Sequence, residues 1–165
     1  MIPQKDALPM TYARSRLILP ALCIAMTLAA APALAQSSNE SPNEQVAFPE
    51  GYENGVHYGT FKRGGITEEL YTSPAAIAAA KAGEPFPDGT VIMMEDHRDG
   101  KLYRYIAMEK RAEWDEYSVS GSWLFREWDA NRVAKASEDG TSCQSCHTSQ
   151  AENDFVFTHH LMLDD

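Results

Sequence analysis

The stretch CQSCH, residues 143–147, constrains this chain more than any other feature of its 165 residues. Two cysteines separated by two residues and followed directly by a histidine are typical of a c-type haem attachment site. Each thiol can add to one haem vinyl group, and His147 is then placed to bind the iron from one face. Only 18 residues follow His147. The common cytochrome layout, with an early motif and a methionine ligand far downstream, therefore cannot be built here. Any second iron ligand must come from the sheet predicted below or from this short tail.

The first 35 residues have the features of a secretory signal peptide. Arg14 and Arg16 precede the uncharged run LILPALCIAMTLAAA, and the small-residue pattern ALA follows at residues 33–35. The run of 15 residues is shorter than the roughly 20 needed to span a bilayer. We predict cleavage before Gln36, export to the periplasm, and no membrane attachment afterwards. Cys23 is removed with the leader, so the mature protein keeps only the two cysteines of CQSCH.

Two other interpretations of the cysteine pair remain open. A disulfide between Cys143 and Cys146 would close a very short loop and would contribute little stability. A zinc site would combine both cysteines with His159, but the neighbouring His160 does not fit the usual spacing of a fourth ligand. Export and the adjacent histidine favour covalent haem c, one per chain. We therefore predict Cys143, Cys146 and His147 as haem-binding residues, with His147 as the proximal iron ligand.

Charge limits the partners of the chain. Acidic residues outnumber basic ones by 24 to 14, and the net charge is −10 at pH 7. This balance disfavours nucleic acid and anionic lipid as partners. It suits a basic redox partner protein, and equally a chain whose acidity only keeps it soluble.

Short β-prone runs separated by turn residues dominate the sequence from Tyr52 onward. They cover residues 56–62, 66–72, 90–95, 102–109 and 121–128. The dipeptides GG at 64–65 and DG at 99–100 suit hairpin turns. In SPAAIAAAKAG, residues 73–83, serine suits an N-cap, proline the first helical position and the last glycine the helix end.

These elements predict an α+β fold that is mainly β. It consists of a five-stranded antiparallel sheet, one short helix, and a C-terminal helical haem-attachment segment at residues 142–150. Residues 36–47 are polar and have no apolar period, so we expect a disordered lead-in there. Residues 48–165 are expected to form one haem c-binding domain.

Sulfur and imidazole donors for a second iron ligand are few: Met93, Met94, Met108, Met162, His57, His97, His159 and His160. A methionine on a strand is more often a core residue than a ligand. Histidines in the tail are expected to be exposed. The charged residues Glu95, Asp96, Glu109 and Arg111 lie near strand ends and are expected to face water.

Several short motifs resemble, in their order and spacing, the cytochrome P-460 family, which includes the β-sheet cytochromes c prime (c prime-beta). The motifs are FPEGY (48–52), HYGTF (57–61), LYTSPAA (70–76), FPDGTVIMME (86–95), MEKRAEW (108–114), CQSCH, and DFVFT (154–158). The resemblance implies haem against one face of the sheet, His147 as proximal ligand, an open or apolar distal side, and often a homodimer.

The resemblance also bears on activity. The P-460 enzymes proper oxidise hydroxylamine and use a lysine, on the strand after the DGTV turn, that is cross-linked to the haem. This chain has Met94 at the matching position, and a thioether has no amine to form that bond. Lys62, Lys101 and Lys110 are expected to be solvated. The chain is thus more similar to sister proteins that bind nitric oxide at an uncross-linked haem behind an apolar cap.

We predict a haem c protein that binds nitric oxide or a related small nitrogen species at an open iron face, with Met94 among the haem-binding residues. Two alternatives remain: an oxidoreductase acting on hydroxylamine or nitric oxide, and a six-coordinate electron-transfer cytochrome. Candidates for an apolar cap are Phe61, Phe86, Phe125, Phe155 and Phe157.

Overall fold

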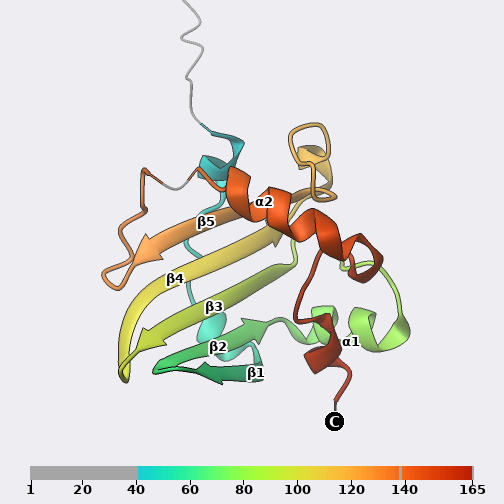
Figure 1. Cartoon of the computed structure of the whole chain (residues 1–165). Helices are drawn as coiled ribbons and strands as arrows, with labels where there is room; N and C mark the ends of the chain where they lie inside the picture. Colours follow the sequence, from blue (N-terminus) through green and yellow to red (C-terminus); the bar gives the residue numbers. More distant parts are fainter. Residues whose placement is uncertain (1–40, 138, 165) are drawn as a thin grey trace, which may run out of the picture. The chain divides into compact units, whose positions relative to one another are not determined.

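The computed structural model describes residues 41–137 and 139–164. In this part of the chain five antiparallel strands form one sheet, in the order β1-β2-β3-β4-β5 (Figure 1). The strands are β1 (Val56–Arg63), β2 (Ile66–Thr72), β3 (Val91–Arg98), β4 (Lys101–Lys110) and β5 (Trp123–Asp129). The predicted α+β, mainly β class with a five-stranded antiparallel sheet is confirmed. The predicted signal peptide and residues 36–40 lie outside the described residues.

Among the described residues, two α-helices and five short 3₁₀ helices accompany the sheet. They are η1 (Pro42–Gln45), η2 (Tyr52–Asn54), α1 (Pro74–Ala82), η3 (Ala112–Trp114), α2 (Thr141–His147), η4 (Thr148–Asn153) and η5 (His159–Met162). The predicted C-terminal helical segment is present as α2 and η4. No helix in the described part of the chain is long and apolar enough to cross a membrane.

Local sequence signals account for the ends of these elements. Ser73 caps α1, because its hydroxyl oxygen accepts a hydrogen bond from the Ala76 N–H at 3.1 Å. Gly83 ends α1 in the left-handed conformation, with φ +66°. At the β3–β4 turn, Asp99 and Gly100 both have positive φ, 49° and 74°. This is the pattern of a hairpin turn whose twist matches the flanking strands.

The strand register gives the sheet two buried faces. Residues that are paired directly across antiparallel strands lie on the same face, so the pairs of Met108 with Ile92 and with Phe125 place these three side chains together. They form an apolar cluster with residues of α1 and of the C-terminal segment. Met93 points to the opposite face, where a second cluster includes Val46 and other apolar residues of the sheet and its N-terminal flank.

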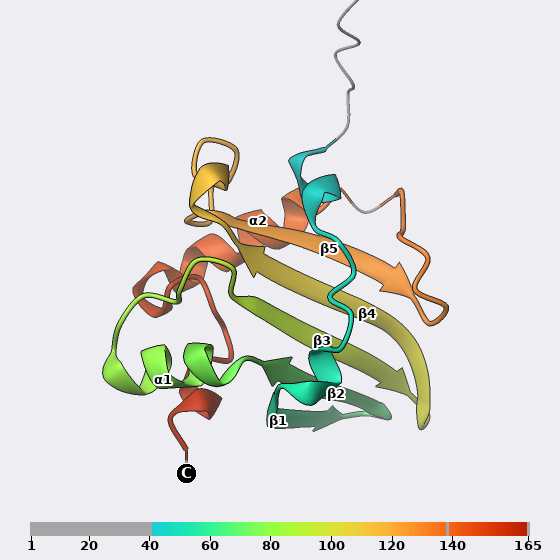
Figure 2. The ribbon, with the colours of Figure 1, turned by 180° about the vertical axis from the view of Figure 1, so that it is seen from behind.

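The structure differs from the expected disordered lead-in at residues 41–47. This segment forms η1 and continues across the face of the sheet seen in Figure 2. Asn43 is buried, and its side-chain oxygen accepts a hydrogen bond from the Phe125 N–H at 2.6 Å. The segment is ordered because Asn43 supplies a partner to the outer edge of β5 and Val46 enters the second apolar cluster.

Candidate cofactor-binding site

A cavity of about 500 Å³ lies between one face of the sheet and the C-terminal part of the chain. The sheet contributes Phe61, Arg63, Glu68, Leu70, Ile92, Met94, Ile106, Met108 and Phe125, and the C-terminal part contributes Cys146, His147, Val156, Phe157 and Thr158. The volume is within the range of about 300–1,000 Å³ that is usual for small-molecule and cofactor sites. The walls are predominantly apolar, which suits a large flat organic group.

Strand alternation decides which side chains of the sheet reach this cavity. Met94 is paired with Leu70 on β2 and with Ile106 on β4, and all three line the cavity. Its neighbour Met93 is fully buried on the other face. The structure therefore places Met94, a residue predicted to bind the cofactor, in the apolar wall that the sheet contributes to the cavity.

His147, the last residue of α2, is half-buried and lines the cavity. Its Nδ1 lies 2.6 Å from the carbonyl oxygen of Phe155. A carbonyl oxygen only accepts, so the proton is on Nδ1, and the lone pair of Nε2 is left for a metal ion. The ring also contacts Phe125 and Phe157, at centroid distances of 4.6 and 4.9 Å.

Burial also controls the charge of this imidazole. It lowers the pKa of His147 below the ordinary histidine value, and the hydrogen bond to the Phe155 carbonyl opposes this effect only in part. The ordinary value is about 6.5, so the ring is predominantly neutral at pH 7. Neutral imidazole is the form that binds metal ions.

The two cysteines of CQSCH lie on α2 three residues apart, and positions with this spacing are neighbours on a helix surface. Cys146 lines the cavity. Cys143 is half-buried and packs against the apolar cluster on the cavity side of the sheet. The arrangement brings Cys143, Cys146 and His147 to the same side of the sheet as Met94.

α2 begins where the chain passes close to β5. Gly140 precedes the helix with φ +76°, and a Cβ atom there would lie 2.4 Å from Cγ of Asn43 and 2.6 Å from the Phe125 carbonyl oxygen. Only glycine fits this conformation without displacement. Gly140 therefore allows α2 to approach the sheet.

Few of the other candidate ligands lie at the cavity. Of the eight methionines and histidines considered as second iron ligands, the lining of this cavity includes only Met94 and Met108. His57 and His97 lie 2.7 and 2.8 Å from glutamate oxygens, and His160 is exposed, as expected of a tail histidine. His159 differs from that expectation, because it is partly buried with its ring 5.9 Å from that of Phe86.

The aromatic candidates for a cap divide in a similar way. Phe61, Phe125 and Phe157 line the cavity. Phe86 and Phe155 instead pack in the adjoining apolar cluster. In the described part of the chain no group of three or more His, Cys, Asp or Glu side chains is placed to hold a metal ion.

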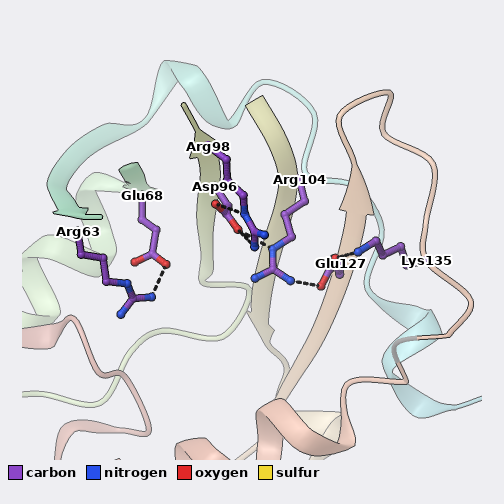
Figure 3. A network of polar contacts seen from close by, with 7 residues as sticks. All are labelled: Arg63, Glu68, Asp96, Arg98, Arg104, Glu127 and Lys135. Atoms are coloured by element: carbon purple, nitrogen blue, oxygen red, sulfur yellow. Dashed lines mark hydrogen bonds and ion pairs between the residues drawn. The ribbon is translucent and has the colours of Figure 1, made fainter. Parts of the chain in front are cut away.

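A row of ion pairs, which the sequence did not predict, lies on the face of the sheet that lines the cavity (Figure 3). Asp96 is only 1% exposed, and its Oδ2 lies 2.8 Å from Nε of Arg104 and 3.1 Å from a terminal nitrogen of Arg98. Arg104 also reaches Glu127 at 2.8 Å, and Glu127 pairs with Lys135. The expectation that Asp96 faces water was therefore wrong.

The physical reason is again alternation. Asp96 follows Met94 by two residues and shares its face, and it is paired directly with Arg104 across β3 and β4. Burial alone would raise the pKa of Asp96, but the hydrogen bonds and positive charges of Arg98 and Arg104 outweigh burial and lower it. Opposite charges at paired strand positions are a signal that could have revealed this row.

Glu109 and Lys110 also depart from the expected solvation. Glu109 is buried and lies 2.6 Å from a guanidinium nitrogen of Arg111. Lys110 is 16% exposed, and its Nζ lies 2.6 Å from Oδ2 of Asp154. Each residue is thus largely withdrawn from water and paired with an oppositely charged side chain. Lys62 and Lys101 are exposed, as expected.

Comparison with known proteins agrees with this geometry. Residues 49–158 match the family model described as Cytochrome P460. Comparison with curated proteins gave no match. The matched residues include the whole sheet, α2 and all but the end of the C-terminal segment. Haem, the cofactor of this family, fits an apolar cavity with a neutral imidazole in its wall. The sheet, the cavity and this match together show that the chain belongs to the cytochrome P460 family of haem proteins.

Proposed function

We propose that this chain is an exported mono-haem c-type cytochrome that binds nitric oxide or a related small nitrogen species at an open face of the iron. One observation carries the proposal: a single cavity is lined both by His147, whose Nε2 is left without a proton, and by an apolar wall around Met94. Haem, when bound, supplies an iron atom with one position for His147 and one for an external ligand.

The attachment would use the cysteines of α2. The thiols of Cys143 and Cys146 would form thioethers with the two vinyl groups, and Nε2 of His147 would bind the iron. The hydrogen bond from Nδ1 to Phe155 holds the imidazole in the tautomer and orientation that this role needs. Cys143 and Cys146 would thus hold the haem covalently, and His147 would bind its iron.

The other wall favours a small ligand that needs no hydrogen-bond donor. Leu70, Met94 and Ile106 offer no N–H or O–H group. The polar side chains in the lining have protein partners: Arg63 lies 3.0 Å from Glu68, and the hydroxyl of Thr158 lies 2.8 Å from that of Tyr58. Bound dioxygen is stabilised by a donor in the distal pocket, whereas nitric oxide binds ferrous iron tightly without one.

A second candidate function is electron transfer. The thioether of Met94 lines the same cavity as His147, and methionine and histidine on the two faces of the iron would give a six-coordinate, higher-potential haem. The oxidoreductase alternative has less support, because the lining includes no lysine among the described residues and its one carboxylate, Glu68, is paired with Arg63. For either function we propose a periplasmic location, a redox partner protein, and a homodimer.

The test is the absorption spectrum of the protein exported in a host that matures c-type haem. A high-spin ferrous spectrum that changes when nitric oxide is added supports the open site. A low-spin spectrum indifferent to nitric oxide refutes it and supports electron transfer. Haem that stays with the wild-type chain on a denaturing gel, and is lost when Cys143 and Cys146 are both replaced by serine, supports the covalent attachment.

Two matched variants assign a sixth ligand if there is one. Met94→Leu removes a sulfur from the sheet wall of the cavity, and Met108→Leu removes one from the neighbouring strand of the same wall. If Met94 binds iron, only Met94→Leu converts a low-spin spectrum to high-spin. If the site is open, both variants keep the high-spin spectrum and the response to nitric oxide.

A further inference from the structure

We infer that Asp154, held by Lys110, is a positioning residue for His147. The carboxylate of Asp154 acts without touching the imidazole. It holds the turn that contains Phe155, and the Phe155 carbonyl accepts the hydrogen bond from Nδ1 of His147. The inference deepens the proposed function, since it rests on His147 as the iron ligand. It names two residues outside the cavity lining that act on the iron through His147.

The turn has an unfavourable backbone. Asp154 and Phe155 follow one another with φ of +50° and +64°. Asp tolerates the left-handed region better than most residues, but a bulky residue such as phenylalanine rarely adopts it. Such a conformation persists only where surrounding contacts hold it.

Contacts from three parts of the chain hold this turn. The Oδ2 atom of Asp154 accepts from the ammonium group of Lys110 at 2.6 Å and from the Phe86 N–H at 2.8 Å. Trp123 Nε1 lies 3.5 Å from the other carboxylate oxygen. The side chains of Lys110 and Asp154 are only 16% and 18% exposed, so their attraction is less screened than that of a surface pair.

The ring of Phe155 is fixed as well. It packs so closely on Gly121 that a Cβ atom at that glycine would lie 2.2 Å from the ring. The Phe155 N–H donates to the Gln150 carbonyl at 2.8 Å. With its ring and its N–H both held, Phe155 presents its carbonyl to Nδ1 of His147 at 2.6 Å.

This carbonyl has a direct effect on a bound metal ion. A hydrogen bond to the second nitrogen of a ligating histidine fixes its tautomer and raises its basicity. Loosening the turn lengthens that bond, so the imidazole becomes a weaker electron donor. Iron bound by Nε2 then has a weaker bond to His147, and its ferric form is less stabilised.

The test compares Lys110→Met and Asp154→Ala with wild type in the haem-loaded protein. The iron–histidine stretching frequency of the ferrous form is measured by resonance Raman spectroscopy, and the reduction potential by titration. Both variants are expected to shift the frequency down and the potential up. Lys110→Arg keeps the positive charge and is expected to restore much of both values.

Arg111→Met is the matched control. Arg111 is the next residue, and it also forms an ion pair at 2.6 Å, but with Glu109. This control is expected to leave the frequency and the potential at their wild-type values. A lowered thermal midpoint in Lys110→Met with an unchanged frequency would show a purely structural role and overturn the inference. If Asp154→Ala does not fold, the Lys110→Met and Lys110→Arg pair decides alone.

A separate readout distinguishes failure of the proposed function from failure of this inference. If the full chain carries no haem, the proposed iron ligation fails, but nitrogen-15 NMR of the histidine rings still reports the tautomer of His147. The wild-type ring is expected to carry its proton on Nδ1, and Lys110→Met is expected to mix the two tautomers. An unchanged tautomer in Lys110→Met would again overturn the inference.

Discussion

Loss of the Asn43 side chain gives the most direct test of how the sheet is held together, because this side chain pairs with the backbone at the outer edge of β5. Its Oδ1 atom accepts from the buried Phe125 N–H at 2.6 Å, and its Nδ2 atom donates to the Asp139 carbonyl at 2.6 Å. The Asn43→Ala substitution leaves the Phe125 N–H without a partner on the edge of β5, at a site that is buried from water. The substitution should therefore lower the free energy of unfolding.

The magnitude follows from these two bonds. A buried donor left without a partner costs about 1–3 kcal/mol, and the bond to Asp139, at a more exposed site, contributes about 0.5–1.5 kcal/mol. We expect Asn43→Ala to lower the free energy of unfolding by about 2–4 kcal/mol. Denaturant titration followed by far-ultraviolet circular dichroism measures it, with an unchanged slope as evidence that only stability has changed.

Asn54→Ala is the matched control for this measurement. The side chain of Asn54 is exposed, and it makes one hydrogen bond, to the Gly51 carbonyl at 3.1 Å. The same substitution there should change the free energy of unfolding by no more than about 0.5 kcal/mol. Equal effects of the two substitutions, in samples with equal haem content, would refute the view that Asn43 completes the edge of β5.

Three further predictions concern other parts of the fold. Asp96→Asn should lower the free energy of unfolding at pH 7. Because the pKa of Asp96 is lowered in the folded protein, the stabilisation by its carboxylate is complete above the unfolded pKa of about 3.9 and is lost as the pH falls through the lower folded value. Denaturant titrations should therefore show the difference between Asp96→Asn and wild type shrinking below about pH 4. Gly140→Ala should cost about 2–4 kcal/mol, since it combines an unfavourable φ with contacts of 2.4 and 2.6 Å, and haem content per chain should fall with it. Ser73→Ala removes the cap of α1 and should cost about 1 kcal/mol in thermal unfolding without changing the haem spectrum.

The fold was predictable because its signals are local. Two-residue turns with glycine, alternating apolar strands, and a serine cap with a terminal glycine each act within a few residues, and their elements appear where the sequence placed them. Disorder at residues 41–47 was predicted wrongly for the opposite reason. The partner of Asn43 is the edge of β5, which is 82 residues away in the chain, and composition alone carries no trace of that pairing.

The site was predictable in part. CQSCH identified the candidate attachment residues, and alternation along β3 was enough to place Met94 on one face and Met93 on the other. The partner of His147 was not predictable, because it is a backbone carbonyl in a turn whose conformation depends on tertiary contacts. The burial of Asp96 was missed because its arginine partners become apparent only when the strands are placed in register.

The register of the strands links the turns of the sheet to the chemistry of the cavity. A shift of one residue along β3 would replace Met94 in the wall by Met93 or Glu95, because the side-chain period of a strand is two. With Glu95, an ionisable carboxylate would line the cavity, and the wall would no longer be apolar. Both residues of the turn at 99–100 have positive φ, which limits the loop geometries open to the β3–β4 hairpin. A register shift between Asp96 and His97 then sets how the rest of β3, with Met94, pairs with β4. The turn and this register shift together therefore decide which side chain of β3 lines the cavity.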